Sequence, residues 1–517
     1  MSDPSSFAPE LADPPRRNRW VYVVLFLVLP ICVLVGVSFS LSNSAHSELR
    51  QAIAETDRLD PRWRLEDVES DRAYIPPEQN SAEVVMRIKT LLPPKWPAWE
   101  QPAQTADPAA KSKRAALEES FQKLEQQRQL NTAQTEALRA ELKRAAAALA
   151  EARKLSEMPD GRYPISYTPD FIGTLLPFAQ TARETARMLS LDALLRAQEG
   201  KADDALTSCR AVLNAGRSLG DEPLLISQLV RIACRAVAVS QTQRMLAQGE
   251  PADAALRQLQ QLLEKEEPEP LLIIGTRGER AGIDRLMAAL QSGQVSGDGV
   301  MREMGMVGDS GESAPLIESL AIRFPGFIPS QRAALLRHMT RAVEIAKLPP
   351  DHHRHELEQL DGNVKQQPVL VRLLAPAVNK VAAACLRSRV ELRCAIAAVA
   401  AERYRRQKGQ WPDKLETLHQ AGYLTQVPVD LYDGKPLRFL RLDDGLLIYS
   451  VGPDGADNGG LIDRDKPYSF GTDMGFRLWD VPRRRQPPVP LKRQENGGAM
   501  PPGLPPQPGQ PPVGKGK

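Results

Sequence analysis

The sequence predicts a mainly α-helical protein that has one N-terminal transmembrane helix and a small α+β module near its C-terminus. Aromatic residues make up only 5% of the 517 residues, while the good helix formers Ala, Leu, Gln, Glu and Arg are abundant. Residues 20–41 carry no charge. Short strand-like runs occur at Leu437–Leu442 and Leu446–Val451, separated by Asp443-Asp444-Gly445. A chain of this length is expected to form two or three domains.

Charge and cysteine content exclude several function classes. The chain has 67 basic and 64 acidic residues, a net charge of +3, so it offers no basic excess for nucleic acid. Its five cysteines form no CxxC pair, which argues against zinc and thioredoxin-like sites. The sequence also contains no G-x-S-x-G elbow, no H-E-x-x-H motif and no dinucleotide fingerprint. An enzyme therefore lacks sequence support.

The N-terminus predicts a single-pass membrane anchor. Residues 1–19 are polar and end in Arg16-Arg17-Asn18-Arg19, and residues 20–41 are long enough to cross a bilayer as a helix. Because the arginines precede the span, we expect residues 1–19 to be cytoplasmic and the bulk of the protein to be periplasmic, at a bacterial inner membrane. A cleaved signal peptide is the alternative, since small residues follow at Ser42, Ser44 and Ala45.

Residues 48–394 are expected to form a helical domain. Within it, apolar spacing over residues 115–156 predicts either one long helix or a helical hairpin that bends near Asn131. Residues 291–315 are rich in Gly, Ser and Met, which is typical of a flexible loop.

Residues 170–265 have the pattern of stacked helix pairs. A helix, a glycine turn and an acid-led second helix occur around Gly200 and again, loosely, around Gly249. The arrangement resembles tetratricopeptide repeats, although 49 residues separate the two glycines. A bundle of this kind would offer grooves to protein partners.

Two short segments suggest sites that we weigh against plainer interpretations. Asp351-His352-His353-Arg354-His355-Glu356 places His352 and Glu356 one helical turn apart, which suits a metal, but a solvated helix face is favoured. Gly275-Thr276-Arg277-Gly278-Glu279-Arg280 lacks the Gly-Lys-Ser/Thr ending of a phosphate loop, so a plain loop or a helix start is favoured.

The best candidate site lies in the expected α+β module, residues 395–481. An oxygen-rich loop there combines glycines with aspartates, which suits Ca²⁺ because clustered carboxylates repel one another unless they are solvated or bind a cation. A hydrated glycine-rich turn is the alternative interpretation. The aspartates of the loop are Asp454, Asp457, Asp463, Asp465 and Asp473.

Four motifs carry a family resemblance over residues 395–480, less than a fifth of the chain. They are Gly409-Gln410-Trp411-Pro412, Pro428-Val429-Asp430, Asp433-Gly434-Lys435-Pro436-Leu437 and Tyr449-Ser450-Val451-Gly452-Pro453-Asp454-Gly455. This segment resembles the C-terminal half of the type II secretion major pseudopilin, protein G. The family's processing site is absent. The overall layout resembles large membrane-anchored planctomycete proteins that end in the same module, a resemblance that brings no activity with it.

The resemblance implies a long helix packed against a small antiparallel sheet, with calcium in the last loop. The positions that match the family's loop acids are Asp454, Asp457 and Asp473. It also suggests one functional alternative, an accessory component of a type II secretion-like system.

The remaining tail, residues 482–517, is expected to be disordered because its Pro- and Gly-rich composition cannot bury enough apolar surface. Arg483-Arg484-Arg485 at its start is expected to be solvated. The favoured function is a membrane-anchored periplasmic structural or interaction protein. The alternative from a different class is an envelope enzyme, a hydrolase that uses acidic residues of the helical domain.

Overall fold

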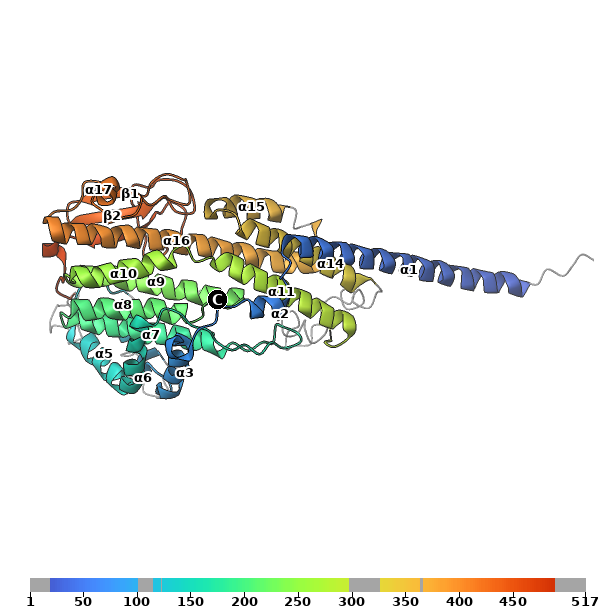
Figure 1. The fold of residues 1–517 in the computed structure, drawn as a ribbon, viewed down its shortest axis with the longest axis horizontal. Helices are drawn as coiled ribbons and strands as arrows, with labels where there is room; N and C mark the ends of the chain where they lie inside the picture. The colour runs from blue at the N-terminus through green and yellow to red at the C-terminus, as the bar shows by residue number, and fades with distance from the viewer. Residues whose placement is uncertain (1–18, 101–114, 122, 297–325, 363–365, 489–517) are drawn as a thin grey trace, which may run out of the picture.

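The structure is a computed structural model that describes residues 19–100, 115–121, 123–296, 326–362 and 366–488. These residues are mainly helical, as predicted, with one small antiparallel sheet (Figure 1). The expected N-terminal tail, most of the 291–315 loop and most of the C-terminal tail lie outside the described residues.

The first helix, α1 (Arg19–Leu59), has two halves with different surroundings. Its C-terminal half packs through the buried Leu49 and Ala52 against Ala333 and Leu336 of α14 (Phe327–Ala346). Its N-terminal half projects from the body (Figure 1) and exposes large apolar side chains such as Phe26, which is 80% exposed. Within the described ranges, no helix is both long and apolar enough to be assigned as a membrane span. The transmembrane helix stays a prediction.

Residues 115–156 do not form one long helix. A helical segment at 115–121 is separated from α5 (Thr132–Arg144) by a non-helical stretch. The break ends at a capping box, in which Asn131 and Gln134 bond each other's backbone N–H groups. Gln134 also donates its side-chain amide to the Ser120 carbonyl oxygen at 3.0 Å. The chain therefore bends near Asn131.

The short elements of the N-terminal half surround this bend. They are α2 (Leu65–Ser70), α3 (Ser81–Leu91), α6 (Ala146–Arg153) and the 3-10 turns at Pro77–Gln79, Ala98–Glu100 and Lys154–Glu157. The buried Leu138, Leu142 and Leu149 of α5 and α6 join the main core with Val84, Val85 and Ile88 of α3.

Four successive helices form the centre of the body: α7 (Pro177–Gln198), α8 (Ala202–Arg217), α9 (Leu225–Gln248) and α10 (Asp253–Glu266). Helix α7 packs against α8, α8 against α9, and α10 against α8 and α16 (Val369–Lys408) (Figure 1). Gly200 ends α7 with a positive φ of 79°, a conformation that glycine adopts without a steric penalty. The helix–glycine–helix pattern of the sequence thus corresponds to the α7–α8 pair.

The helix α11 (Leu271–Ser292) differs from what the sequence predicted for this segment. The segment Gly275–Arg280 was expected to be a loop or helix start, but it continues through the body of this helix. Its glycines allow close packing: a Cβ on Gly278 would lie 1.6 Å from the Pro223 carbonyl oxygen, and one on Gly282 would lie 2.0 Å from the Phe171 ring. These glycines serve helix packing and not phosphate binding.

The C-terminal module is built on the end of α16 (Val369–Lys408), which crosses the expected domain boundary between residues 394 and 395 without a break. Three strands, β1 (Arg438–Leu442), β2 (Gly445–Ser450) and β3 (Met474–Trp479), pair in sequence order as an antiparallel sheet. A two-residue turn at Asp443-Asp444 joins the first two strands, within one residue of the predicted runs.

The sheet packs on α16, and one core serves the bundle and the module. Cys394 and Ala398 of α16, Phe476 of β3 and Leu213 of α8 belong to the same cluster of buried residues. A short helix, α17 (Leu415–Gln420), adds the buried Leu418. Because the module shares its core with the helical bundle, the two are expected to unfold together.

The start of the C-terminal tail also differs from the prediction. Residues 482–488 are ordered against the body after a 3-10 turn at Val481–Arg483. Arg484 is buried and forms an ion pair with Glu402, which is also buried, at 2.8 Å. Gln486 accepts from the Gln129 N–H and donates to the Gln127 carbonyl oxygen. The expectation of a solvated arginine run is wrong for Arg484, because a buried carboxylate on α16 binds it.

Candidate functional site

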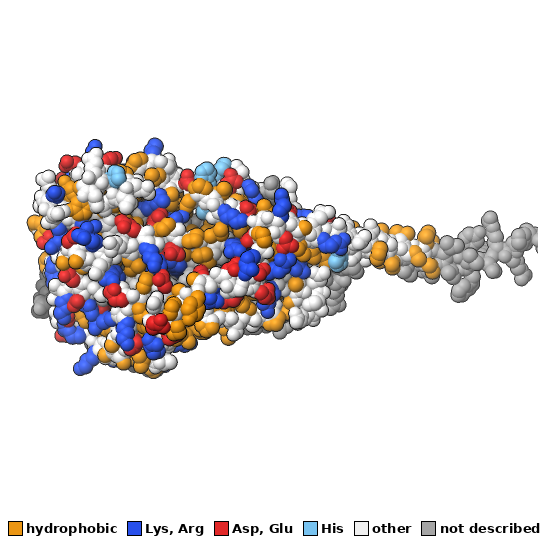
Figure 2. Space-filling view, in the orientation of Figure 1, with side chains coloured by type: hydrophobic (Ala, Val, Ile, Leu, Met, Phe, Trp, Pro, Cys, Tyr) orange, Lys and Arg blue, Asp and Glu red, His pale blue; other side chains and the backbone are white. Residues whose placement is uncertain are grey.

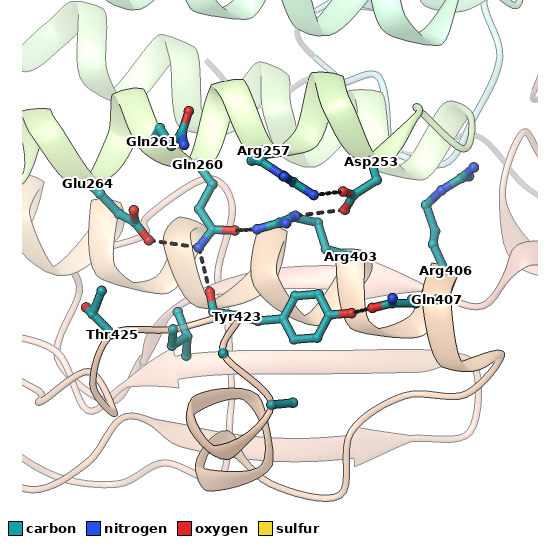
Figure 3. Close-up of a pocket in the computed structure, with 13 residues that line it drawn as sticks. Asp253, Arg257, Gln260, Gln261, Glu264, Arg403, Arg406, Gln407, Tyr423 and Thr425 are labelled. Carbon is teal, nitrogen blue, oxygen red and sulfur yellow. Dashed lines mark hydrogen bonds and ion pairs between the residues drawn. The ribbon is translucent and has the colours of Figure 1, made fainter.

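A large cavity lies between the helical bundle and the C-terminal module (Figure 3). Its volume is about 870 Å³. One wall is α10, the other is the end of α16, and residues 421–425 form its floor after α17. Five lining side chains form the polar contacts of this cavity: Asp253, Arg257, Gln260, Arg403 and Tyr423. Each comes from an element whose position depends on the shared core.

Hydrogen bonds connect the two walls of this cavity. Arg403 donates from Nε to Asp253 Oδ1 at 2.8 Å and from Nη1 to Gln260 Oε1 at 2.9 Å. Gln260 in turn donates its amide to the Tyr423 carbonyl oxygen at 2.7 Å. The Arg403 guanidinium also lies 5.3 Å from the centroid of the Tyr423 ring, within the range of a cation–π contact. Figure 3 shows these groups pointing toward one another across the cavity.

The electrostatics of the cavity favour binding over acid–base chemistry. Burial acts to raise the pKa of Asp253, but hydrogen bonds from Arg403 and Arg257 outweigh it and hold the pKa below its usual value. Asp253 is therefore a paired carboxylate at neutral pH and not a proton donor. The cavity presents guanidinium, amide and carbonyl groups, which suit a polar peptide segment.

The three aspartates of the candidate calcium site lie in the loop between β2 and β3. Asp454 accepts from the backbone N–H of Ala456 at 3.0 Å and of Gly471 at 2.8 Å, and these bonds lower its pKa. Asp473 is fully buried and accepts from the N–H of Asn458 and of Gly460. Burial raises the pKa of Asp473 above its usual value. Asp454 also bonds the Asn458 amide, so both carboxylates hold one segment.

The third aspartate faces different partners. Asp457 accepts from Tyr449 OH and the Gly459 N–H, and its other oxygen lies 3.5 Å from Arg438 Nε. Among the residues that the structure describes, no three His, Cys, Asp or Glu side chains are grouped to hold a metal ion. The three aspartates accept hydrogen bonds from the loop backbone, from Tyr449 and from the Asn458 amide, and Asp457 also pairs with Arg438.

The module contains a buried carboxylate, Asp430, that the sequence does not identify as a site residue. Asp430 is fully buried and accepts from Ser450 Oγ at 2.8 Å, from the Val451 N–H at 2.9 Å and from the Tyr432 N–H at 3.0 Å. It therefore connects two of the motifs that carry the family resemblance. The sequence contains Asp430 in the Pro428-Val429-Asp430 motif, but spacing alone does not show that Asp430 binds Ser450.

The histidine cluster divides between two faces of α15 (Pro350–Gly362). His353 is buried and its Nε2 lies 2.7 Å from the Leu348 carbonyl oxygen, while His352 is exposed. His355 Nε2 lies 2.7 Å from the Gln359 amide nitrogen. The three imidazoles are thus not brought together.

No protein-family model, no curated protein and no solved structure matches the chain. The function must be argued from the geometry.

Proposed function

We propose that this chain is a single-pass, membrane-anchored protein of the bacterial envelope whose helical bundle and C-terminal module act in the periplasm as a structural and interaction element. The observation that carries the proposal is the division of α1. Its N-terminal half exposes Phe26, Leu34 and Phe39, each more than 70% exposed, whereas its C-terminal half packs in the body (Figure 2). Such a continuous apolar surface is costly in water and suits lipid.

Ion pairs at the base of α1 support the anchoring role. Directly after α1, Asp60 accepts from Arg277 at 2.9 Å and from Arg280 at 2.5 Å, both on α11. The Thr56 hydroxyl bonds the Thr340 hydroxyl of α14 at 3.0 Å. These contacts fix the direction in which the exposed half leaves the body, so a helix inserted in lipid would hold the body at a defined orientation.

The anchor is tested by alkaline carbonate extraction of cell membranes. The full chain is expected to stay in the pellet, and a variant lacking residues 1–41 is expected in the supernatant. A full chain that carbonate releases would contradict the anchor, because peripheral proteins are released and spanning helices are not.

The cavity of Figure 3 is the proposed contact surface for a polar segment of a partner protein. A photo-crosslinking residue at Gln261 or Thr425, which line the cavity, is expected to capture a specific neighbour in native membranes. The matched control is Gln180, an exposed residue of α7 that does not line it. Equal capture from all three positions would remove this surface from the proposal. Recovery of secretion components in the captured material would support the accessory role in a type II secretion-like system.

We also propose, from the family resemblance, that the loop binds calcium through Asp454, Asp457 and Asp473. This proposal is tested on the full chain, because the module shares its core with the bundle. A ligand that binds only the folded state raises the free energy of unfolding, by about 2.7 kcal/mol at a concentration 100 times Kd. A higher melting midpoint in calcium than in chelator supports the proposal. Equal midpoints would agree with the hydrogen bonds of the loop and remove calcium from it.

A further inference from the structure

A second cavity, which shares no lining residue with that of Figure 3, lies where α9, α11, α14, α15 and α16 meet. It has a volume of about 360 Å³, within the range of about 300–1,000 Å³ that holds small ligands. Its walls come from α9, the start of α11, the connection between α14 and α15, and the middle of α16. Most of its lining is apolar, including Leu272, Ile273, Ala346 and Leu386.

Two guanidinium groups line this apolar cavity. The Arg235 side chain is 2% exposed and uses Nε and Nη2 on Glu266. The Arg389 side chain is 18% exposed and donates from Nε to the Glu267 carbonyl oxygen at 3.0 Å. Within the described part of the chain, Arg235 Nη1 and both terminal nitrogens of Arg389 have no hydrogen-bond acceptor. Guanidinium N–H groups that have no acceptor in the protein are available to an anion in the cavity.

Each neighbouring acid is shared by more than one arginine. Glu266 is fully buried and is shared by Arg217, Arg231 and Arg235. Glu269 lines the cavity, but its Oε2 is 3.2 Å from Arg231 Nη2. Arg389 Nε lies 3.4 Å from Glu267 Oε1, and Arg393 pairs with the same carboxylate. The arginines around the cavity therefore outnumber the carboxylates that they share, and burial lowers the pKa of both Arg235 and Arg389.

We propose that this cavity binds an anionic amphiphile, a carboxylate or phosphate monoester that carries a short acyl or alkyl chain. The anionic group accepts from Arg389 and Arg235, and the chain lies against Leu272, Ala346 and Leu386. Guanidinium groups are suited to both anions because their paired N–H donors match two oxygens. The apolar lining contributes by removing the chain from water.

The same cavity argues for binding and not for covalent catalysis. Burial raises the pKa of the Cys385 thiol to about 11, so the thiol stays protonated at neutral pH and is a poor nucleophile. Burial lowers the pKa of His353, whose Nε2 already faces the Leu348 carbonyl oxygen. The structure shows no contact between these two side chains. The cavity therefore gives the hydrolase alternative no activated nucleophile.

The experiment measures binding calorimetrically, with the full chain in lipid nanodiscs and empty nanodiscs as the blank. The probes are octanoate, octyl phosphate, octanol and acetate. Octanoate or octyl phosphate is expected to bind, and the tighter of the two identifies the anionic group. Octanol lacks the charge and acetate lacks the chain, so both are expected to bind at least ten-fold more weakly. Octanol binding as tightly as octanoate, or no binding by either anionic probe, would overturn the proposal.

Two variants and one matched control locate the site. Arg389→Gln removes the charge and is expected to weaken binding about ten-fold or more, and Glu267 keeps its other partner, Arg393, at 2.8 Å. Arg393→Gln is the control, because Arg393 pairs with the same carboxylate but does not line the cavity. Ala346→Phe fills the cavity without changing charge and is expected to abolish binding. Unchanged affinity in both Arg389→Gln and Ala346→Phe would place any bound amphiphile elsewhere and overturn the proposal.

Discussion

Replacing Arg484 with alanine is expected to destabilise the folded chain by about 3 kcal/mol, although this residue lies in a stretch whose composition suggests a free tail. Its side chain is 3% exposed and donates to both oxygens of Glu402, at 2.9 and 2.8 Å. It also donates to the carbonyl oxygens of Trp479 and Gly249, at 2.9 Å each. Removal would therefore leave a buried carboxylate and two carbonyl groups with fewer donors.

The expected loss of about 3 kcal/mol depends on which partners Glu402 keeps when Arg484 is removed. Loss of one partner of a buried ion pair costs about 3–5 kcal/mol. Arg405 still reaches the same carboxylate at 2.8 and 3.0 Å, so the lower end of that range applies. Burial acts to raise the pKa of Glu402, but Arg405 and Arg484 outweigh it and lower the pKa. Because the folded pKa is depressed, this contribution is present at neutral pH and is lost as the pH falls through the acidic range.

The assay is urea unfolding of the full chain, followed by tryptophan fluorescence, since Trp479 is buried next to this ion pair. Arg483→Ala is the matched control, because Arg483 is exposed in the same turn and exposed substitutions usually change stability by less than about 0.5 kcal/mol. Equal unfolding midpoints for the two variants would refute the assignment of residues 482–488 to the fold.

Three further predictions concern other parts of the chain. Gly278→Ala is expected to lower stability by about 1–3 kcal/mol or more, since its Cβ would lie 1.6 Å from a carbonyl oxygen, whereas Gly362→Ala, with open space, is expected to be neutral in a melting assay. Asp430→Ala is expected to cost about 3 kcal/mol in urea unfolding, because it strands three donors; a loss below 1 kcal/mol would contradict the network. Burial raises the pKa of Glu222 to about 7, so the free energy of unfolding should fall by about 3 kcal/mol as the pH rises from near 4.5 to above 7. Glu222→Gln should flatten this dependence of stability on pH. An unchanged dependence in the variant would contradict the prediction.

Local patterns in the sequence predicted the elements that depend on neighbouring residues. The glycine turn at Gly200, the hairpin turn at Asp443-Asp444 and the break near Asn131 each follow from backbone preferences within a few residues. Helical content was predicted for the same reason. These features do not require knowledge of what packs against them.

Features that depend on distant partners could not be predicted in this way. Arg484 appears solvated in the sequence because Glu402, its partner, lies 82 residues away. Gly278 resembles part of a loop because the backbone of Pro223, which needs the space, belongs to the distant connection between α8 and α9. The aspartates of the last loop accept hydrogen bonds from N–H groups whose positions depend on the fold of the loop, so spacing in the sequence does not give these partners.

The cavity lined by Arg235 and Arg389 could not be predicted from the sequence either. Arg235 and Arg389 are 154 positions apart, and each resembles an ordinary polar residue of a helix face. Only the packing of α9 against α16 brings both to one apolar space.

The central claim, that the apolar half of α1 lies in lipid and carries the body to the periplasm, is tested most directly by a topology reporter fused after Lys517. A phosphatase reporter that is active only in the periplasm is expected to be active on the full chain, and its activity is expected to be lost when residues 20–41 are deleted. An inactive phosphatase at that position, with an active cytoplasmic reporter in its place, would contradict the claim.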